Sequence, residues 1–600
     1  MVGVIKVGRI KDFDGTLKLS ICKKGKSDAE EDYNYKHRII ENKICITVGS
    51  TSSGKTVMNF TRTNMFHKLG YTCIRLTEKK TNPFESICMM LPVKEQYHLD
   101  FLKLQGQEPM KKEELKGLLK IWHPLIIPNI QTKEGRDDYE KIYRKKHFPI
   151  NWFAFPMKMP EPVVMAILMG NADKETVRIC KSINESLKDD EDLWDMVNNI
   201  SEAISSKEYS VFYDPRYMGV DVGMVGSKRS IETIANSFYM FGNYYCFQPD
   251  NFKLQYKVGE NVEEIKILNQ EGILEILNDN SHIHQLSTVY YTDKRVKYVV
   301  IINFLLQMAE AIGKGGVKHP IYLSFDEIRN ILPKIGKEMG ASFQIELSML
   351  IGELLRELRN TGKGVTADLF TQEYFKTDSE ATASVNTRHW MRCSLEDKKI
   401  LIRDFEWTKS RIELIDGLQT GECIIIEELE EYEGTKFLVS MPPFAVPEEK
   451  YVVVEEFANH YPEEMARYDD LFKQLTKHKH DIEIKVKKRL VERQVRRRKV
   501  EEDSKLNKEQ KLKEQIEKKV TKKFEKEDRQ KSKENLREEC YKMRKEGYSS
   551  NTEPMSFSTI AQKLGLSDPT ARAYCYQYAM LVKDHDFLRL EGKGYLIKEN

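Results

Sequence analysis

Eight residues near the amino terminus have the types and the spacing of a phosphate-binding loop. They are Gly49, Ser50, Thr51, Ser52, Ser53, Gly54, Lys55 and Thr56, in that order. Glycines let backbone N–H groups turn toward phosphate oxygens, Lys55 reaches the β- and γ-phosphates, and the Thr56 hydroxyl is a ligand for Mg²⁺. A chance turn of serines and glycines is the alternative. The pattern, a complete Walker A motif, predicts that ATP and Mg²⁺ bind here.

A pair of carboxylates would supply the rest of the chemistry. Asp326 and Glu327 directly follow the apolar run 321–325, so a strand there places both at its carboxyl end. We expect Asp326 to hold the Mg²⁺ shell and Glu327 to polarise the water that attacks the γ-phosphate. Such a pair by itself can be a solvated loop start. Together with the phosphate loop it forms a Walker B motif.

A third candidate is an uncharged amide. Gln372 directly follows 365–371, the next expected strand, where it would sense the γ-phosphate or orient the attacking water, as glutamine does in other P-loop enzymes. The alternative is a surface glutamine without a role. Its place at the end of an expected strand favours the catalytic interpretation.

The segments that carry these motifs alternate between strand and helix patterns. Strands are expected at about 44–48, 71–76, 282–287, 321–325, 365–371, 388–394 and 422–427, with helices at 57–69, 294–312 and 344–360. Strand alternating with helix is typical of a mainly parallel sheet covered by helices. The sequence therefore predicts an α/β fold with a RecA-like P-loop ATPase core.

Patterning also divides the chain into parts. We expect a small β lobe at 1–40, with strands at 2–7 and 17–22, and the ATPase core at 41–92 and 282–445. Residues 93–281 are expected to form a largely helical insertion, with helices near 111–121 and 174–205. A charged helical linker at 446–550 and a compact unit at 551–600 complete the chain. A length of 600 residues fits several domains.

Composition favours a cytoplasmic protein. The most apolar stretch, 298–308, is interrupted by Asn303 and Gln307, which indicates a buried helix and not a membrane span. The first residues lack the apolar core of a signal peptide. Ten cysteines without a C-x-x-C pair argue against a zinc cluster and against a disulfide framework.

Positive charge is concentrated in one segment. Residues 477–546 contain 27 Lys and Arg against 16 Asp and Glu, a local excess of +11 in a chain of net charge +3, so the rest carries −8. Neither Pro nor Gly interrupts residues 463–546. We expect one long, largely solvated helix with a thin apolar stripe at Leu512, Ile516, Val520 and Phe524. A solvated spacer and a phosphate-contacting helix are both open.

The last fifty residues have helix-turn-helix spacing. Within 557–574, Ala561 is small where two helices would cross, Gly565 would make the turn, and Pro569 suits the first turn of the second helix. A hairpin at 588–597 would complete a winged helix. A protein-binding winged helix is the alternative, but the adjoining basic segment favours DNA. The side chains expected to face DNA are Ser558, Thr570, Arg572 and Gln577.

The order of these motifs resembles the HerA/FtsK superfamily of hexameric DNA-pumping ATPases. Between the Walker B pair and Gln372 lies 354–364, similar to that family's Arg-x-x-Gly turn before its Thr-Gln strand, and 386–388 and 418–426 are similar to later segments. The resemblance covers about 40–445. The short amino-terminal segment and the absence of an acidic motif at 76–80 are departures from the family. They fit a divergent member from a mobile element.

The resemblance implies a ring of subunits. It implies a homo-hexamer with the nucleotide between subunits, where an arginine from the neighbour stabilises the transferred phosphoryl group, worth about 10³–10⁵ in rate. Motif position makes Arg359 the first candidate and Arg388 the second, with a surface salt bridge as the alternative for each. A nuclease or another mobile-element protein is an expected partner.

The main functional hypothesis is an ATP-driven DNA translocase, in repair, segregation, conjugation or packaging. The first alternative is a DNA-binding regulator or partitioning protein in which nucleotide acts only as a switch. Glu327 argues against a pure switch, because a switch can do without a catalytic base. The second alternative is a secretion-associated ATPase that works on protein, which leaves the basic carboxyl-terminal half unexplained.

Overall fold

A computed structural model describes most of the residues of the chain. These are 2–10, 33–38, 43–77, 85–157, 245–291, 294–328, 364–377, 382, 385–427, 436–447, 453–549, 556–582, 589–591 and 594–596. Arg359, the helices expected at 344–360 and 174–205, and the strand expected at 17–22 lie outside them. The chain forms two compact units, residues 1–486 and residues 487–600.

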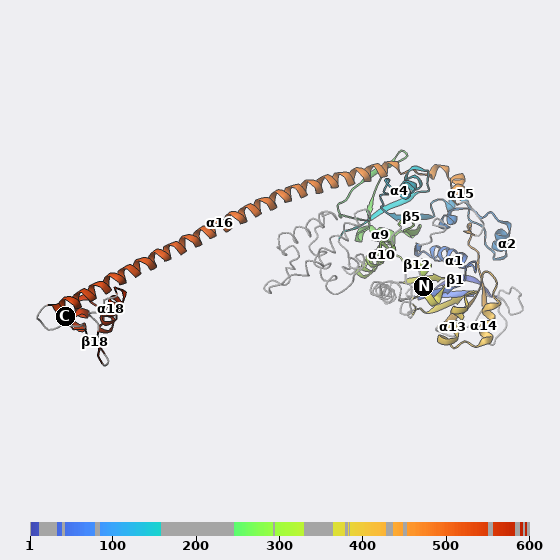
Figure 1. Cartoon of the computed structure of the whole chain (residues 1–600). Helices are drawn as coiled ribbons and strands as arrows, with labels where there is room; N and C mark the ends of the chain where they lie inside the picture. The colour runs from blue at the N-terminus through green and yellow to red at the C-terminus, as the bar shows by residue number, and fades with distance from the viewer. Residues whose placement is uncertain are drawn as a thin grey trace. The chain divides into compact units, whose positions relative to one another are not determined.

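One large sheet organises the first unit (Figure 1). Its strand order is β10-β6-β5-β11-β4-β12-β13-β3-β14-β15-β16-β1-β2, with β7 paired to β6. The strands are β1 (Val2–Ile10), β2 (Tyr33–Arg38), β3 (Lys43–Val48), β4 (Thr72–Thr77), β5 (Leu119–Pro124), β6 (Ile150–Pro156), β7 (Phe247–Gln248), β10 (Lys266–Ile267), β11 (Ile283–Ser287), β12 (Ile321–Asp326), β13 (Val365–Thr371), β14 (Thr387–Trp390), β15 (Glu422–Glu427) and β16 (Lys436–Val439). A separate hairpin joins β8 (Gln255–Val258) to β9 (Asn261–Glu264).

The larger part of the sheet is parallel. Every pair from β10 to β14 is parallel, whereas β14-β15, β15-β16, β16-β1 and β1-β2 are antiparallel. The central strands β4, β11, β12 and β13 are buried along their whole length, as expected for parallel strands covered on both faces. The predicted α/β fold with a mainly parallel P-loop core is confirmed.

The region between 93 and 281 differs from its expected helical character. Within its described part, β5, β6 and β10 extend the central sheet, and β5 pairs directly with the core strand β11. A helix was expected over 111–121, but α3 ends at Leu115 and β5 begins at Leu119. Both β5 and β6 are buried on both faces, so they lack the alternating pattern by which a half-buried strand is recognised.

The amino-terminal strands join the same sheet. The strand β1 pairs with β16, and β2 pairs with β1. Residues 2–10 and 33–38 therefore extend the antiparallel edge of the ATPase core.

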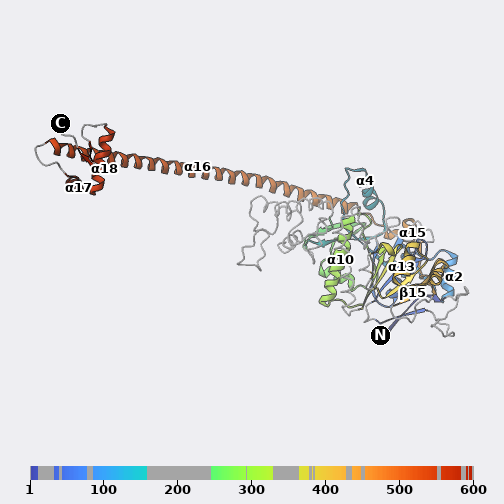
Figure 2. The same ribbon diagram turned by 60° about the horizontal axis from the view of Figure 1, so that its bottom comes forward.

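Helices flank this sheet. Those of the first unit are α1 (Lys55–Lys68), α2 (Gln96–Leu104), α3 (Lys112–Leu115), α4 (Lys133–Tyr139), α9 (Gln270–Leu277), α10 (Lys294–Lys314), α13 (Leu395–Asp404), α14 (Lys409–Asp416) and α15 (Val453–His460), with short turns η1 (Glu85–Met90), η2 (Glu140–Arg144), η6 (Tyr374–Lys376) and η8 (Pro462–Glu464). The helix α1 contacts β4, β12 and β13. The helix α9 packs beside α10 (Figure 1), and Figure 2 shows α10 from a second direction. The residues of α1 from 57 to 64 are all buried, so this helix is an interior element.

The helix α10 is the one described helix long and apolar enough to cross a membrane. Its apolar window, Val296–Lys314, is 78% buried inside the first unit. The helix thus packs as a core element of this unit, consistent with the interpretation of 298–308 as a buried helix.

One helix, α16 (Asp469–Ser549), spans the charged segment. The second unit adds α17 (Phe557–Leu564), α18 (Asp568–Leu581) and the antiparallel pair β17 (Arg589–Glu591) and β18 (Gly594–Leu596). Its small core contains Cys540 of α16 together with residues of α17 and α18. The carboxyl-terminal end of α16 is therefore the first helix of this unit, which begins before residue 551.

Candidate functional site

The phosphate loop connects β3 to α1, as its sequence predicts. The backbone of Ser52 has φ 61° and that of Gly54 has φ 101°, and such left-handed residues help to turn successive N–H groups inward. A Cβ on Gly54 would lie 3.0 Å from the Cα of Gly421, and one on Gly49 would lie 2.5 Å from the Ser53 Oγ. Glycine is required at both positions by close packing.

Lys55 is positioned by the loop itself. Its Nζ donates to the carbonyl oxygens of Gly49 at 2.5 Å and of Ser50 at 2.9 Å. The ammonium thus lies over the loop on the side to which phosphates would bind. The phosphate loop fits a nucleoside triphosphate, because its positive-φ turn and its lysine together suit a cluster of anionic oxygens.

Strand order brings the Walker B pair and Gln372 to the same edge. The strand β13 lies between β3 and β12, and Thr371 at its end is in register with Val48 of β3. Asp326 is the last residue of β12. Because the carboxyl ends of parallel strands share one edge of a sheet, these groups converge beside the phosphate loop. Asp326 and Glu327 are both largely buried. The Thr56 hydroxyl and the Asp326 carboxylate are oxygen ligands suited to Mg²⁺.

Glu327 has an unusual backbone. Its φ is 62°, a left-handed conformation that costs a non-glycine residue on the order of 1–3 kcal/mol and that concentrates at functional sites. Its Oε1 accepts the backbone N–H of Gln372 at 3.0 Å and the Thr371 hydroxyl at 3.4 Å. The candidate base is therefore held against the end of β13.

Gln372 links the candidate base to the phosphate loop. Its side-chain Oε1 accepts a hydrogen bond from the Thr51 hydroxyl at 3.3 Å, while its backbone binds Glu327. These two contacts place Gln372 between the phosphate loop and Glu327, where a γ-phosphate would lie. Sequence placement predicted the residue but not the direct contact with Glu327.

A buried polar network lies behind this edge. Arg62 of α1 makes a bidentate ion pair with Asp368 of β13, and the Tyr322 hydroxyl of β12 donates to the same carboxylate at 2.6 Å. Burial raises the pKa of the Asp368 carboxyl, and the Arg62 charge opposes that change. The network joins the helix of the phosphate loop to the strands of Glu327 and Gln372. No sequence motif pointed to it.

A second buried arginine lies near Asp326. Arg75 of β4 is 2% exposed, and its guanidinium lies 4.5 Å from the ring centroid of Phe60. Burial lowers the pKa of this guanidinium, and the Asp326 carboxylate is the largest opposing influence. Arg75 thus contributes fixed positive charge behind the expected metal ligands.

Of the two candidates for the arginine supplied by a neighbouring subunit, the structure describes one. Arg359 lies outside the described residues. Arg388 lies within β14, where its Nη2 donates to the Thr382 carbonyl at 3.3 Å and its guanidinium lies 5.0 Å from the ring centroid of Phe405. In this structure the Arg388 side chain is engaged within its own subunit.

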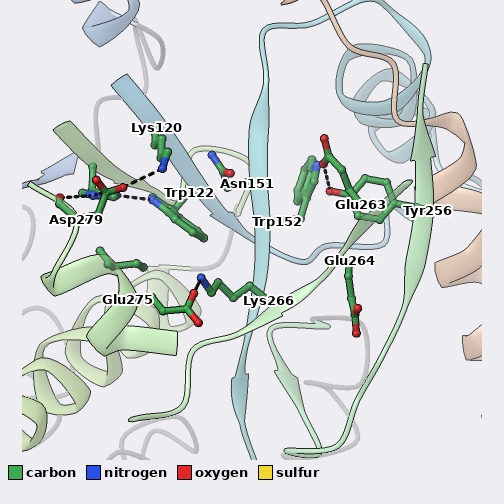
Figure 3. A pocket seen from close by; sticks show the side chains of 12 residues that line it. Lys120, Trp122, Asn151, Trp152, Tyr256, Glu263, Glu264, Lys266, Glu275 and Asp279 are labelled. Atoms are coloured by element: carbon green, nitrogen blue, oxygen red, sulfur yellow. Dashed lines mark hydrogen bonds and ion pairs between the residues drawn. The ribbon is translucent and has the colours of Figure 1, made fainter. Parts of the chain in front are cut away.

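A cavity of about 400 Å³ lies away from this edge, toward the amino-terminal ends of β5, β6 and β11 (Figure 3). Its polar side chains largely pair with one another, as in the ion pairs of Lys120 with Asp279 and of Lys266 with Glu275, and the hydrogen bond of the Tyr256 hydroxyl to Glu263. The Trp122 indole N–H donates to His284 at 3.0 Å. Because its donors and acceptors are mostly satisfied internally, the cavity is not assigned to the nucleotide.

The predicted DNA-facing residues lie on α17 and α18. Thr570 and Gln577 are seven residues apart and so share one face of α18, whereas Arg572 lies about 200° around the helix from Thr570. The Arg572 guanidinium lies 5.3 Å from the ring centroid of Phe557, and the Ser558 hydroxyl donates to Asp568 at 3.2 Å. The four side chains therefore do not form one patch.

The helix-turn-helix geometry follows the local sequence. Gly565 ends α17 with φ 62°, Ser567 precedes α18, and Pro569 occupies its first turn. Ile560, Ala561 and Ala571 are buried between the helices. The structure pairs β17 with β18, at the place where the hairpin of a winged helix was expected, and the winged-helix assignment itself stays a prediction.

The fold and the site together define a P-loop NTPase. No family model and no curated protein matches the chain. Among solved structures the chain is similar to VirB4 of Thermoanaerobacter pseudethanolicus, with a TM-score of 0.39 and 10% identity over 74% of this chain and 98% of that chain. It is also similar to the bacterial conjugative coupling protein TrwB, with a TM-score of 0.37 and 9% identity over 68% of this chain and 89% of that chain.

A further similarity is to the genome packaging NTPase B204 from Sulfolobus turreted icosahedral virus 2, in complex with AMP. Its TM-score is 0.19 and its identity 11%, over 28% of this chain and 71% of that chain. At these identities and TM-scores the similarities carry no conclusion about activity, which is inferred from the site alone.

Proposed function

We propose that this protein is an ATP-driven DNA translocase. The single observation that carries the hydrolytic part is the convergence of the phosphate loop, Glu327 and Gln372 at one edge of the sheet. Lys55 binds the phosphates, Thr56 and Asp326 hold Mg²⁺, and Glu327 activates water. Bound Mg²⁺ supplies charge neutralisation for the transferred phosphoryl group.

DNA is proposed as the translocated polymer because of the carboxyl-terminal unit and α16. A segment with 27 basic and 16 acidic residues favours a polyanion through counterion release. The unit built from α17 and α18 is proposed to contact DNA as a winged helix, with Thr570 and Gln577 on one face. We also propose that the protein acts in the cytoplasm.

Subunits are proposed to form a homo-hexameric ring in which a neighbour completes the nucleotide site. Arg359 is the first candidate for the arginine supplied by the neighbour, and Arg388 is the second. If Arg359 acts in this way, mixing R359A subunits with K55A subunits restores activity at some interfaces, whereas each variant alone is inactive. A nuclease or another mobile-element protein is the proposed partner.

Steady-state ATP hydrolysis with and without duplex DNA tests the proposal. We expect DNA to stimulate hydrolysis and K55A to abolish the stimulated rate, because the ammonium no longer binds the phosphates. Displacement of a triplex strand or a bound protein roadblock then separates a translocase from a nucleotide switch. Single-turnover hydrolysis without displacement would instead support the DNA-binding regulator. Stimulation by an unfolded protein in place of DNA would support the secretion ATPase.

A further inference from the structure

The phosphate loop is supported from two sides, and the proposed catalytic residues lie on only one of them. The β13 side carries Glu327 and Gln372. On the other side of β3 lies β14, with Trp390 in register with Val48. The chain that leaves β14 at Met391 therefore emerges at the same edge of the sheet as the phosphate loop.

Two connections on this side touch the loop directly. The Ser50 N–H donates to the Arg392 carbonyl at 2.7 Å, and the Met391 N–H donates to the Val48 carbonyl at 2.8 Å. Before β15, the Gly421 N–H donates to the Ser53 carbonyl at 2.8 Å, and the Thr420 hydroxyl donates to the Ser52 carbonyl at 3.2 Å. The loop is thus held in shape independently of any nucleotide.

Met391 and Arg392 differ in exposure. Met391 is buried, and its Sδ accepts a hydrogen bond from the Ser53 hydroxyl at 3.4 Å. Arg392 is exposed, and among the described residues its guanidinium has no hydrogen-bond, ion-pair or ring partner. The nearby cations Lys55 and Arg388 contact carbonyl oxygens of the chain. Arg392 therefore has a guanidinium without a partner among the described residues, and it directly follows Met391, which contacts the phosphate loop.

The two sides face different ends of a nucleotide. In the proposed nucleotide site, Glu327 and Gln372 place the γ-phosphate end on the β13 side of β3. Since β14 lies on the opposite side of β3, a nucleotide bound along the loop directs its α-phosphate, ribose and base toward Arg392. A planar guanidinium binds phosphate through its fork of N–H groups and also stacks on an aromatic base.

We propose that Arg392 binds the nucleoside monophosphate end of the nucleotide in its own subunit, with Met391 and Thr420 supporting that subsite. This inference rests on the proposed nucleotide site. It assigns Arg392 a role in cis that the β- and γ-phosphate contacts do not cover. Arg392 contacts the bound molecule equally in ATP and ADP, because both carry the same nucleoside monophosphate end.

Equilibrium binding of ADP and of a non-hydrolysable ATP analogue to the full chain tests the proposal. We expect R392A to weaken both affinities by a similar factor, about tenfold, which is about 1.4 kcal/mol. R392K keeps the charge but not the planar fork, so its effect is expected to be smaller. In steady-state kinetics R392A raises KM for ATP by more than it lowers kcat.

Arg403 supplies the matched control. It is an exposed arginine of α13 whose guanidinium pairs with Asp404, so R403A removes the same surface charge without touching the loop, and its nucleotide affinities should equal those of the wild type. Thermal unfolding of R392A checks that the fold is intact.

Two results would overturn the proposal. One is an unchanged affinity of R392A for both ADP and the ATP analogue. The other is a weakening confined to the ATP analogue, which would place Arg392 at the γ-phosphate. Failure of the translocase proposal looks different, because the wild-type protein would bind ADP normally but show no DNA-stimulated hydrolysis.

Discussion

Charged residues serve opposite purposes in the core unit and along α16. In the core, Arg62 and Asp368 are 1% and 2% exposed and share a bidentate ion pair that the Tyr322 hydroxyl joins. From 507 to 535, every side chain of α16 is exposed. The ion pair between Lys523 and Glu527 spans 4.0 Å, with side chains 79% and 55% exposed.

Buried charges determine geometry, whereas single exposed charges do not. A buried charge that loses its partner is left without compensation, so core ion pairs fix the relative positions of α1, β12 and β13. An exposed charge is solvated with or without its partner, so single pairs on α16 contribute about 0–1 kcal/mol. Core charges are thus expected to control folding and catalysis. If α16 binds a polyanion, as proposed, its charges are expected to act through their sum.

The largest effect is expected at the edge where the core charge meets solvent. Replacing Glu327 by Gln keeps the shape and the contact with the Gln372 N–H but removes the base, so kcat should fall by about 10²–10⁴-fold. ADP affinity should change little. Multiple-turnover ATPase assays measure the first quantity, and titration with a fluorescent ADP measures the second.

Glu373 is the matched control for Glu327. It is half-buried, follows Gln372 and pairs with Lys376, so E373Q should retain kcat within a few-fold. Equal decreases of kcat in E327Q and E373Q would show that local charge, and not a positioned base, determines the rate.

The next effect concerns the buried ion pair. Asp368→Ala leaves the Arg62 charge buried and unpaired, so the free energy of unfolding of the core unit should fall by about 3–5 kcal/mol. Denaturant unfolding followed by tryptophan fluorescence measures it. The double variant R62M/D368L should recover most of this stability, since well-packed apolar groups replace both charges. A decrease below about 1 kcal/mol in D368A would remove the distinction between the core and α16.

Buried histidines predict a smaller, pH-dependent effect in the core. Burial lowers the pKa of His123 to about 3 and the pKa values of His147 and His284 to about 4. Between about pH 6.5 and 4 the unfolded chain binds protons that the folded chain does not, so stability falls as pH falls. Each histidine contributes up to about 1.4 kcal/mol per pH unit in that window.

Denaturant midpoints measured from pH 7 to pH 4 check this dependence. His147 accepts from the Tyr290 hydroxyl at 3.0 Å, and H147Q preserves a hydrogen-bonding side chain without the titrating ring. The slope of stability against pH should therefore be shallower in H147Q. An identical slope would mean that His147 is not held neutral by the fold.

Sequence patterns predicted which residues meet at this edge of the sheet, because the signals are local. The loop, the strand before Asp326 and the strand before Gln372 each depend on a few adjacent residues. The ion pair of Arg62 with Asp368 joins residues 306 positions apart, and no spacing encodes it. Likewise β5 and β6 are strands because of their neighbours in the sheet, since Leu119–Pro124 and Ile150–Pro156 do not alternate.

The support of the phosphate loop by Arg392 and Gly421 was missed for the same reason. The resemblance included the segment 418–426 but gave it no role, and the contact with Ser53 appears only when β14, β15 and β3 are placed side by side. At the carboxyl-terminal end, the turn at Gly565 was predictable because only a few adjacent residues determine it. The contribution of Cys540 to that unit was hidden in a segment whose composition indicates a solvated helix.

The smallest effect on stability, and the sharpest contrast, is expected on α16. Changing the exposed Lys518, Lys519 and Lys522 together to Gln should alter the stability of the fold by less than about 0.5 kcal/mol. If α16 binds DNA phosphates, the same change weakens DNA binding and reduces the slope of log K against log salt by about 0.9 for each phosphate that is no longer neutralised. D528N, an exposed acidic control on the same helix, should not reduce that slope. A triple variant with full DNA affinity at every salt concentration would make α16 a spacer and leave DNA binding to α17 and α18.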